Sequence, residues 1–447
     1  MPGYVPHTPE DQRGMLDRIG IAAMDELFAQ IPGNLRLAAL LDLPHGLSEA
    51  ESVRHLEGIA RTNLDCGRGA CFRGAGVYRH FTPSVVPAIM ARGEFLTSYT
   101  PYQPERSQGM LQTIYEFQSL VCRLLGMDAA NASMYDGATA LAEAVVMASS
   151  ITGRKRVLIP ASLHPAYYDV CRTFVQGHGI CLETVPQTNG LTDIDDTRKR
   201  CGNDVAAVVV PQPNYFGMIE DASGLASVAH ENGALAIAVV NPMSMALLPP
   251  PGEWKADIAV AEGQALGLPM NFGGPLVGLF TCRKEFVRQM PGRIVGGTVD
   301  SEGKRAYTLT LQTREQHIRR EKASSNICSN EALCALGVTI YLSQLGKIGL
   351  RRVAEVSVQR AHEAFEAIRT VPGFEPLFDG PFFHEFPMRC PVPVAEINTK
   401  LAERGIIGPQ DLGADYPELG NAGVFCCTEM ISHEDIAALV ATLKEIR

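Results

Sequence analysis

The sequence predicts an α/β protein with a mainly parallel sheet in a large domain and a smaller α+β domain at the C-terminus. Three observations support this fold class. The chain has 447 residues, more than one hydrophobic core usually serves. Six short apolar runs alternate with helical stretches in its middle, a pattern typical of parallel strands covered by helices on both faces. After a polar segment that ends at Asn330, a long helical pattern begins.

These observations divide the chain into three predicted parts. Residues 1–80 mix short helical stretches with Pro and Gly, and we expect an N-terminal arm or cap. Residues 81–330 hold the strand and helix alternation and form the predicted large domain. Residues 331–447 form the predicted small α+β domain.

The elements follow in order. The apolar spacing of residues 47–62 predicts a surface helix. Residues 111–125 form a second predicted helix, and residues 138–148 form a third that is rich in strong helix formers. The small domain is predicted to contain a long helix that runs to Arg369, short strands and a last helix from His433. The six predicted strands are residues 156–161, 180–185, 205–212, 234–242, 256–262 and 276–282.

Composition excludes several classes of function. With 39 basic and 49 acidic side chains, the net charge of −10 argues against nucleic acid or an anionic membrane as the main partner. No apolar run approaches the roughly 18 residues that a membrane-spanning helix needs, and the first residues do not resemble a secretory signal. We therefore expect a cytoplasmic protein. The twelve cysteines are scattered without a Cys-x-x-Cys motif, which favours buried thiols over a disulfide framework or a metal site.

Polar side chains follow the predicted strands and precede the Ala-rich helix. Ligands of open parallel sheets gather at the carboxyl ends of the strands, and a helix start offers N–H groups to a phosphate. These positions could surround a phosphorylated planar cofactor. The candidate residues are His164, Asn214, Asn241 and Gln264 after strands, and Asp136, Gly137 and Thr139 at the helix start.

Each of these features also has an ordinary structural explanation. Asp136 or Thr139 could simply cap the helix, and His164 could be a core histidine with satisfied hydrogen bonds. Gly273 and Gly274 could form no more than a turn into the next strand. Their common order along one sheet is what suggests a site.

Four long segments together resemble one enzyme family. The segments are YTPYQPERSQGMLQTIYEFQ, NASMYDGATALAEA, AEGQALGLPMNFGGPLVG and PGRIVGGTVDSEGKRAYTLTLQTREQHIRREKASSNICSNEAL. They are similar to the glycine decarboxylase P-protein family of the glycine cleavage system, and most closely to the amino-terminal, or alpha, chain of the form that is split into two polypeptides. The resemblance covers essentially the full length. It implies fold type I of the pyridoxal phosphate (PLP) enzymes, which is the aspartate aminotransferase-like fold.

Two groups that PLP chemistry requires are absent from their expected positions. A lysine should follow a strand to form the Schiff base, and an acid should keep the pyridine nitrogen protonated. Matching NFGGP to the glycine-rich turn of the catalytic half places Gln264 at the lysine position. Val239, Val240 and Asn241 stand where the acid is expected. We therefore expect the seven candidate residues to form a vestigial pocket, with PLP held by the partner subunit and not covalently by this chain.

The resemblance also implies that a loop of this chain completes the active site of its partner. The candidate loop, SYTPYQPERSQG, is stiffened by prolines. Its predicted contributions to the partner are Tyr99, Tyr102, Gln103, Glu105 and Gln108. The alternative is a rigid structural crossover. In the polar segment before residue 330, Arg314 and His317 are candidate contacts for glycine or an acidic carrier protein, with an interdomain salt network as the alternative.

The resemblance thus implies the non-lysine-bearing subunit of glycine decarboxylase. Its expected partners are the lysine-bearing subunit 2 and the lipoylated H-protein, which accepts the aminomethyl group, in an alpha2beta2 heterotetramer. Alone, the chain should be inactive. Two alternatives remain: a stand-alone PLP-dependent aminotransferase or lyase, and a purely structural or regulatory subunit.

Overall fold

The computed structural model describes residues 6–37, 39, 41–271 and 274–446, and the chain forms two units, Met1–Asn63 and Leu64–Arg447. The first unit contains α1 (Pro9–Ile19) and α2 (Glu49–Ala60), and α2 confirms the predicted surface helix. Each helix begins with a capping box, in which a Thr or Ser side chain and an acidic side chain satisfy N–H groups reciprocally. Neither helix buries a residue. The predicted three-part division of the chain stays a prediction.

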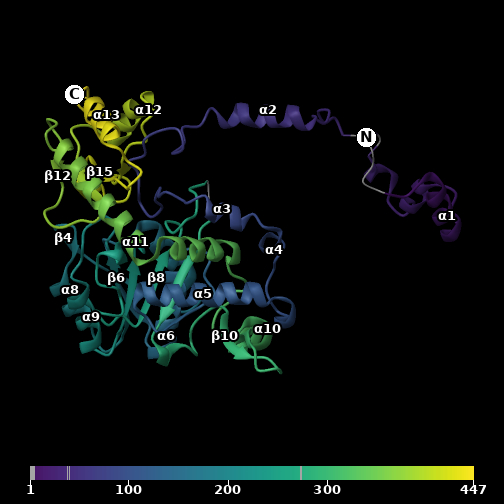
Figure 1. Ribbon diagram of the computed structural model, residues 1–447, viewed down its shortest axis with the longest axis horizontal. Coiled ribbons are helices and arrows are strands. Elements are labelled where there is room, and N and C mark those ends of the chain that lie inside the picture. The colour runs from purple at the N-terminus through teal and green to yellow at the C-terminus, as the bar shows by residue number, and fades with distance from the viewer. Residues whose placement is uncertain (1–5, 38, 40, 272–273, 447) are drawn as a thin grey trace. The chain divides into compact units, whose positions relative to one another are not determined.

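A seven-stranded, mainly parallel sheet forms the centre of the second unit and confirms the predicted fold class (Figure 1). All six predicted strands are present, and a short seventh strand, β1, extends one edge. The order across the sheet is β1 (Ala129–Ala130), β9 (Gly278–Cys282), β8 (Ile258–Glu262), β7 (Leu235–Val240), β6 (Val205–Gln212), β2 (Arg156–Pro160) and β3 (Cys181–Val185). In this sheet β9 runs antiparallel to both of its neighbours, β8 and β1, and the other pairs are parallel. Every residue of β6, β7 and β8 is buried, which explains their continuous apolar sequences.

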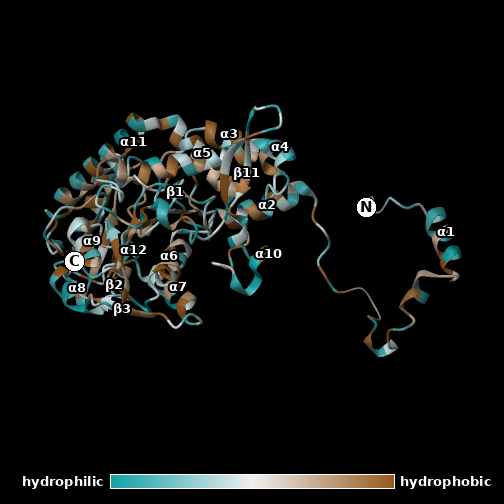
Figure 2. Ribbon diagram, turned by 90° about the horizontal axis from the view of Figure 1, so that it is seen from below, coloured by the Kyte–Doolittle hydropathy of each residue, from teal (hydrophilic) through white to brown (hydrophobic). Residues whose placement is uncertain are grey.

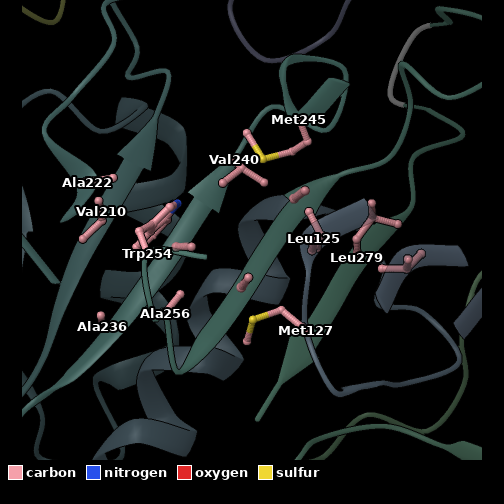
Figure 3. Packing of buried hydrophobic residues seen from close by; sticks show 14 of the residues in the cluster. Leu125, Met127, Val210, Ala222, Ala236, Val240, Met245, Trp254, Ala256 and Leu279 are labelled. Carbon is pink, nitrogen blue, oxygen red and sulfur yellow. The ribbon is translucent and has the colours of Figure 1, made fainter. Parts of the chain in front are cut away.

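Helices cover both faces of this sheet. The predicted helices correspond to α5 (Gln108–Leu125) and α6 (Gly137–Thr152), and both end at a left-handed glycine. The other helices of this unit before the polar segment are α3 (Val85–Met90), α4 (Gly93–Leu96), α7 (Pro165–Val175), α8 (Ile194–Arg200) and α9 (Ala222–Glu231). The hydrophobic cluster on one face includes Trp254, which lies beside Val210, Ala222, Ala236 and Ala256 (Figure 3). A second cluster lies between α6, α7 and the strands.

A long helix, α11 (Ala332–Ile368), joins the sheet region to the C-terminal elements. Figure 1 shows it running beside α5 and then turning toward α12 (Val394–Glu403) and α13 (His433–Leu443). Its first half packs in the large core and its second half in the small one. By length and composition α11 could cross a membrane, but half of its apolar window is buried in the fold. The small sheet has the order β12 (Glu375–Pro376), β13 (Glu385–Arg389), β15 (Ala422–Cys426) and β14 (Gln410–Asp411).

The polar segment before α11 contains structure that the sequence did not predict. An antiparallel hairpin of β10 (Ile294–Val299) and β11 (Arg305–Thr310) packs on α5, and the short α10 (Gln316–Arg319) follows it. A smaller hairpin joins β4 (Gln187–Thr188) to β5 (Leu191–Thr192). Figure 2 shows that α8 and α10 are mostly hydrophilic, as expected of elements with little buried surface. The β10–β11 hairpin and α10 lie next to the loop that was predicted to serve the partner.

Candidate active-site region

A small pocket lies at the carboxyl ends of the parallel strands. Its volume of about 70 Å³ is well below the roughly 300–1,000 Å³ of typical small-molecule sites. Among its lining residues are the predicted His164, Asn214 and Asn241. The sequence did not point to Tyr78 or Glu385, which line it from the segment before α3 and from β13. Strand β13 and the segment around residue 78 therefore help to form the wall of the pocket.

Gln264 is fixed by hydrogen bonds at both ends of its amide. Its Oε1 accepts from the backbone N–H of Tyr78 at 2.8 Å. Its Nε2 donates to the backbone carbonyls of Tyr78 at 3.1 Å and of Leu268 at 2.9 Å. The side chain is buried. At the position predicted for the Schiff-base lysine, the chain thus has a structural tie between the end of β8 and the segment around residue 78.

Asn241 faces a neutral histidine. Its Nδ2 lies 3.1 Å from Nε2 of His384, and its Oδ1 accepts from the backbone N–H of Met243. Burial, together with the nearby His80, holds the pKa of His384 well below its usual range. The residues at this strand end therefore provide no negative charge of the kind that holds a proton on a pyridine nitrogen.

Two carboxylates occupy the start of α6. The Asp136 side chain caps the helix by accepting from the N–H of Thr139 at 2.7 Å, as the simple capping explanation predicted. The Glu262 carboxylate accepts from the N–H of Gly137 at 2.9 Å, and also from the N–H groups of Gln264 and Val277. Burial raises the pKa of Glu262 to about 7. The N–H of Gly137, which the cofactor interpretation offered to a phosphate, is thus bonded to a side chain of the same protein.

His164 and Asn214 have the contacts of structural residues. The Nε2 of His164 lies 2.9 Å from the carbonyl oxygen of Ala75, and its Nδ1 accepts from the N–H of Ala166. Its ring lies between those of Tyr167 and Tyr215, with centroids 5.2 and 4.6 Å away. The Asn214 amide binds the carbonyl of Gly190 and the Glu220 carboxylate, and also accepts from two backbone N–H groups.

These residues do not fit PLP. The pocket has no lysine among its described lining residues, and its volume is small. A phosphate at the start of α6 would find the N–H groups of Gly137 and Thr139 already bonded to Glu262 and Asp136, and the negative charge of Asp136 would repel it. The start of α6 is also crowded, because a methyl group added at Gly137 would lie 2.3 Å from the hydroxyl oxygen of Tyr167. The turn residue Gly273 lies outside the described residues.

The loop predicted to serve the partner is well exposed. Tyr99 and Tyr102 are 78% and 51% exposed, and Gln103 and Glu105 are also at the surface. Gln108 differs from them, because its amide binds both the N–H and the carbonyl of Tyr307, at 2.9 and 2.8 Å, on β11. Gln108 therefore anchors the end of the loop, and the other four side chains are available at the surface. Whether they contact a partner stays a prediction.

A buried arginine that the sequence did not single out holds this loop. Arg293, directly before β10, donates from Nη2 to the hydroxyl oxygen of Tyr102 at 2.8 Å and from Nη1 to that of Thr100 at 3.4 Å. Its Nε lies 3.4 Å from a carboxylate oxygen of Glu315. Only its place in the PGR motif, next to predicted site segments, could have suggested a role.

Arg314 and His317 lie close to this arginine but differ in environment. Arg314 is buried and donates to the carbonyl oxygens of Leu311 at 3.1 Å, of Gly292 at 3.0 Å and of Met290. Burial lowers its pKa. His317 is at the surface, with Nδ1 3.6 Å from Glu315. The hydrogen bonds of Arg314 give it a structural role. A contact with substrate or carrier stays a prediction for both Arg314 and His317.

The cysteines of the described structure form no disulfide. Within the described ranges, no group of three His, Cys, Asp or Glu side chains could hold a metal ion.

Comparisons with known proteins agree on one family. The family described as "Glycine cleavage system P-protein" matches residues 2–443. The chain is 51% identical over 444 residues to "Probable glycine dehydrogenase (decarboxylating) subunit 1" of Desulfitobacterium hafniense, covering 99% of this chain and 100% of that protein. It is also 51% identical over 443 residues to the protein of the same name from Moorella thermoacetica, covering 99% of each.

Solved structures give the same result. A crystal structure of glycine decarboxylase (P-protein) of the glycine cleavage system, in inhibitor-bound form, aligns with a TM-score of 0.92 at 46% identity, covering 100% of both chains. A cysteine desulfurase from Thermococcus onnurineus aligns with a TM-score of 0.61 at 17% identity, covering 85% of this chain and 95% of that one, which shows a shared fold only. From the family match and its full-length relatives, the chain belongs to the glycine cleavage system P-protein family.

Proposed function

We propose that this chain is the subunit of glycine decarboxylase that lacks the Schiff-base lysine, and that the lysine-bearing subunit 2 holds the PLP. The observation that carries the proposal is Gln264, which stands at the lysine position next to the small pocket and is tied at both ends of its amide. The names of the full-length relatives support it, because a protein called subunit 1 implies a second subunit.

In the proposed reaction, the two subunits decarboxylate glycine and transfer the remaining aminomethyl group to the lipoyl arm of the H-protein. PLP, when bound to the enzyme, accepts the electron pair that departing carbon dioxide leaves behind. We place the assembly, an alpha2beta2 heterotetramer, in the cytoplasm.

This chain contributes the exposed loop at residues 99–105 to the active site of the partner. Tyr99 and Tyr102 present hydroxyl groups there, while the bonds from Gln108 to Tyr307 fix the end of the loop. A loop held in this way can orient a ligand and exclude water without adjusting at the moment of reaction.

The test compares the chain purified alone with the chain purified together with subunit 2. We expect PLP absorbance, and exchange of labelled bicarbonate into glycine, only for the pair. Size-exclusion chromatography with light scattering should give a four-chain mass for the pair. A lone chain that is yellow, that exchanges bicarbonate and that yields a pyridoxyl-lysine after borohydride reduction would contradict the proposal and favour a stand-alone PLP enzyme.

A second arm of the test addresses a purely structural subunit. Tyr99→Phe removes one exposed hydroxyl group and leaves the loop sequence otherwise unchanged. We expect slower exchange in the assembled pair. Unchanged exchange by both Tyr99→Phe and Tyr102→Phe pairs would favour a subunit that does not contact the partner's ligands.

A further inference from the structure

Arg293 directs its guanidinium group at the loop and not at the nearest carboxylate. Both terminal nitrogens point to loop hydroxyls, at 2.8 Å to Tyr102 and 3.4 Å to Thr100. Glu315 lies 3.4 Å from Nε, and that nitrogen makes no hydrogen bond within the described residues. Arginines that pair strongly with a carboxylate frequently do so through two parallel hydrogen bonds, and Arg293 makes none to Glu315. The loop is thus the principal partner of this side chain.

The backbone around Arg293 is held in place from two sides. Its carbonyl oxygen accepts from the N–H of Ala132 at 2.8 Å. The buried Arg314 binds the carbonyl oxygen of Gly292, the preceding residue, at 3.0 Å. Gly292 itself has a φ of 73°, a left-handed conformation that glycine adopts without strain. These contacts fix the point from which the Arg293 side chain extends.

The hydrogen bond from Arg293 has a consequence for the Tyr102 hydroxyl. A guanidinium group can only donate, so the Tyr102 oxygen is the acceptor and its own proton remains available. Tyr102 as a whole is 51% exposed, which places this part of the loop at the surface, where a partner chain can approach it. Donation from a charged group draws electron density from the phenol oxygen, which makes the O–H a stronger donor.

We propose that Arg293 is a positioning residue that prepares Tyr102 to donate a hydrogen bond to an anionic oxygen in the partner's active site. The anion is a carboxylate or a phosphate, since both accept such a bond and both occur among the ligands of the proposed reaction. This inference rests on the proposed function. It adds the residue that orients the loop and the kind of ligand atom that the loop contacts.

The test uses the chain assembled with subunit 2. Three variant assemblies are compared with the wild type: Tyr102→Phe, Arg293→Lys and the double variant. Two single variants, Tyr115→Phe and Arg352→Lys, serve as the matched controls. Tyr115 and Arg352 are a partly exposed tyrosine and an exposed arginine outside the loop cluster. The measurements are the dissociation constant for PLP by absorbance titration, and KM for glycine and kcat in bicarbonate exchange.

We expect Tyr102→Phe to raise either the dissociation constant for PLP or the KM for glycine by roughly 10- to 100-fold, the usual effect of losing a hydrogen bond to a charged group. A change in the PLP constant identifies a phosphate, and a change in the glycine KM identifies a carboxylate. Arg293→Lys keeps the charge but loses the fork geometry, so it should weaken the same constant by a smaller factor. In the Tyr102→Phe background it should add no further change, and kcat should change less than the affected constant.

Two results would overturn the inference. One is an active Tyr102→Phe pair with both constants unchanged. The other is a loss from Arg293→Lys that is equally large with and without the Tyr102 hydroxyl, which would assign Arg293 to general stability. If Arg293→Lys does not assemble, Tyr102→Phe alone decides. If the wild-type pair neither binds PLP nor exchanges bicarbonate, the proposed function is wrong and this inference fails with it. If the wild-type pair is active, the variants test this inference separately from the proposed function.

Discussion

At the scale of single residues, carboxylates and amides occupy the positions at which the sequence suggested a cofactor site. Glu262 and Asp136 stand at the start of α6 and accept its first N–H groups. Gln264 and Asn241 stand at the strand ends with their amides engaged. Each of these side chains satisfies hydrogen bonds that a buried site would otherwise leave unmade. They are therefore part of the scaffold.

A lysine at position 264 is not expected to restore cofactor binding. Gln264→Lys would remove the amide bonds to Tyr78 and Leu268 and would bury an unpaired ammonium group. We expect no pyridoxyl adduct at position 264 after incubation with PLP, reduction with borohydride and peptide mass analysis. We also expect destabilisation by several kcal/mol, measured by urea unfolding.

The matched control is Gln112→Lys, at an exposed position of α5, which should unfold like the wild type. An adduct at position 264 would contradict this prediction and show that the pocket still admits the cofactor.

The sequence predicted some site residues and missed others for a clear reason. His164, Asn241 and Gln264 each follow a strand, so the rule for parallel sheets predicted all three, and the structure places His164 and Asn241 in the pocket and Gln264 next to it. Tyr78 is 186 residues from its partner Gln264, and Arg293 is 191 residues from Tyr102. No local pattern reports contacts over such distances.

At the scale of elements, the strands and helices with strong periodicity were predictable. The runs at β6, β7 and β8 are apolar throughout because both faces are covered. The β10–β11 hairpin was missed because the sequence of β10, IVGGTV, contains two glycines and becomes exposed toward its end, so it shows no strand alternation. Its pairing with β11 and its packing on α5 define it instead.

The bend in α11 depends on one glycine. Gly346 has φ 58° and ψ −171° within the helix, a region that essentially only glycine occupies. A Cβ there would meet no atom within 4 Å, so any cost comes from the backbone. We expect Gly346→Ala to destabilise the protein by roughly 1–3 kcal/mol, seen as a lower midpoint in urea unfolding.

Gly109→Ala is the control for this change. Gly109 lies in α5 with no atom within 4 Å of the added methyl group and without a left-handed φ, so alanine there should be neutral or stabilising. Equal midpoints for Gly346→Ala and the wild type would show that the helix tolerates the bend without glycine.

At the scale of the whole molecule, buried glutamates make stability depend on pH. Burial raises the pKa of Glu143, Glu262 and Glu385 to about 7. Because the pKa of each group is higher in the folded than in the unfolded state, its contribution to the free energy of unfolding is complete below about pH 4.5. It is lost as the pH rises toward 7. These three groups therefore favour the folded state more at pH 5 than at pH 8.

Glu143→Gln isolates one of these contributions away from the pocket. As the pH rises from 5 to 8, the free energy of unfolding of the variant should increase relative to that of the wild type by up to about 3 kcal/mol. Urea unfolding at several pH values measures this difference. Glu94→Gln, at an exposed position of α4, is the control and should show no comparable gain. A constant difference between the Glu143→Gln variant and the wild type across this range would contradict the prediction.

The path of α11 determines how the chain can be divided into fragments. Its first half contributes Cys334, Val338 and Tyr341 to the large core, and its second half contributes Ala361 and Ile368 to the small one. A cut after residue 330, where the composition changes, would strip one wall from the large core and leave an apolar stripe on the released piece. Neither product would then be expected to fold by itself. An N-terminal fragment with a complete large core would have to retain α11, whose second half would then lack the small core.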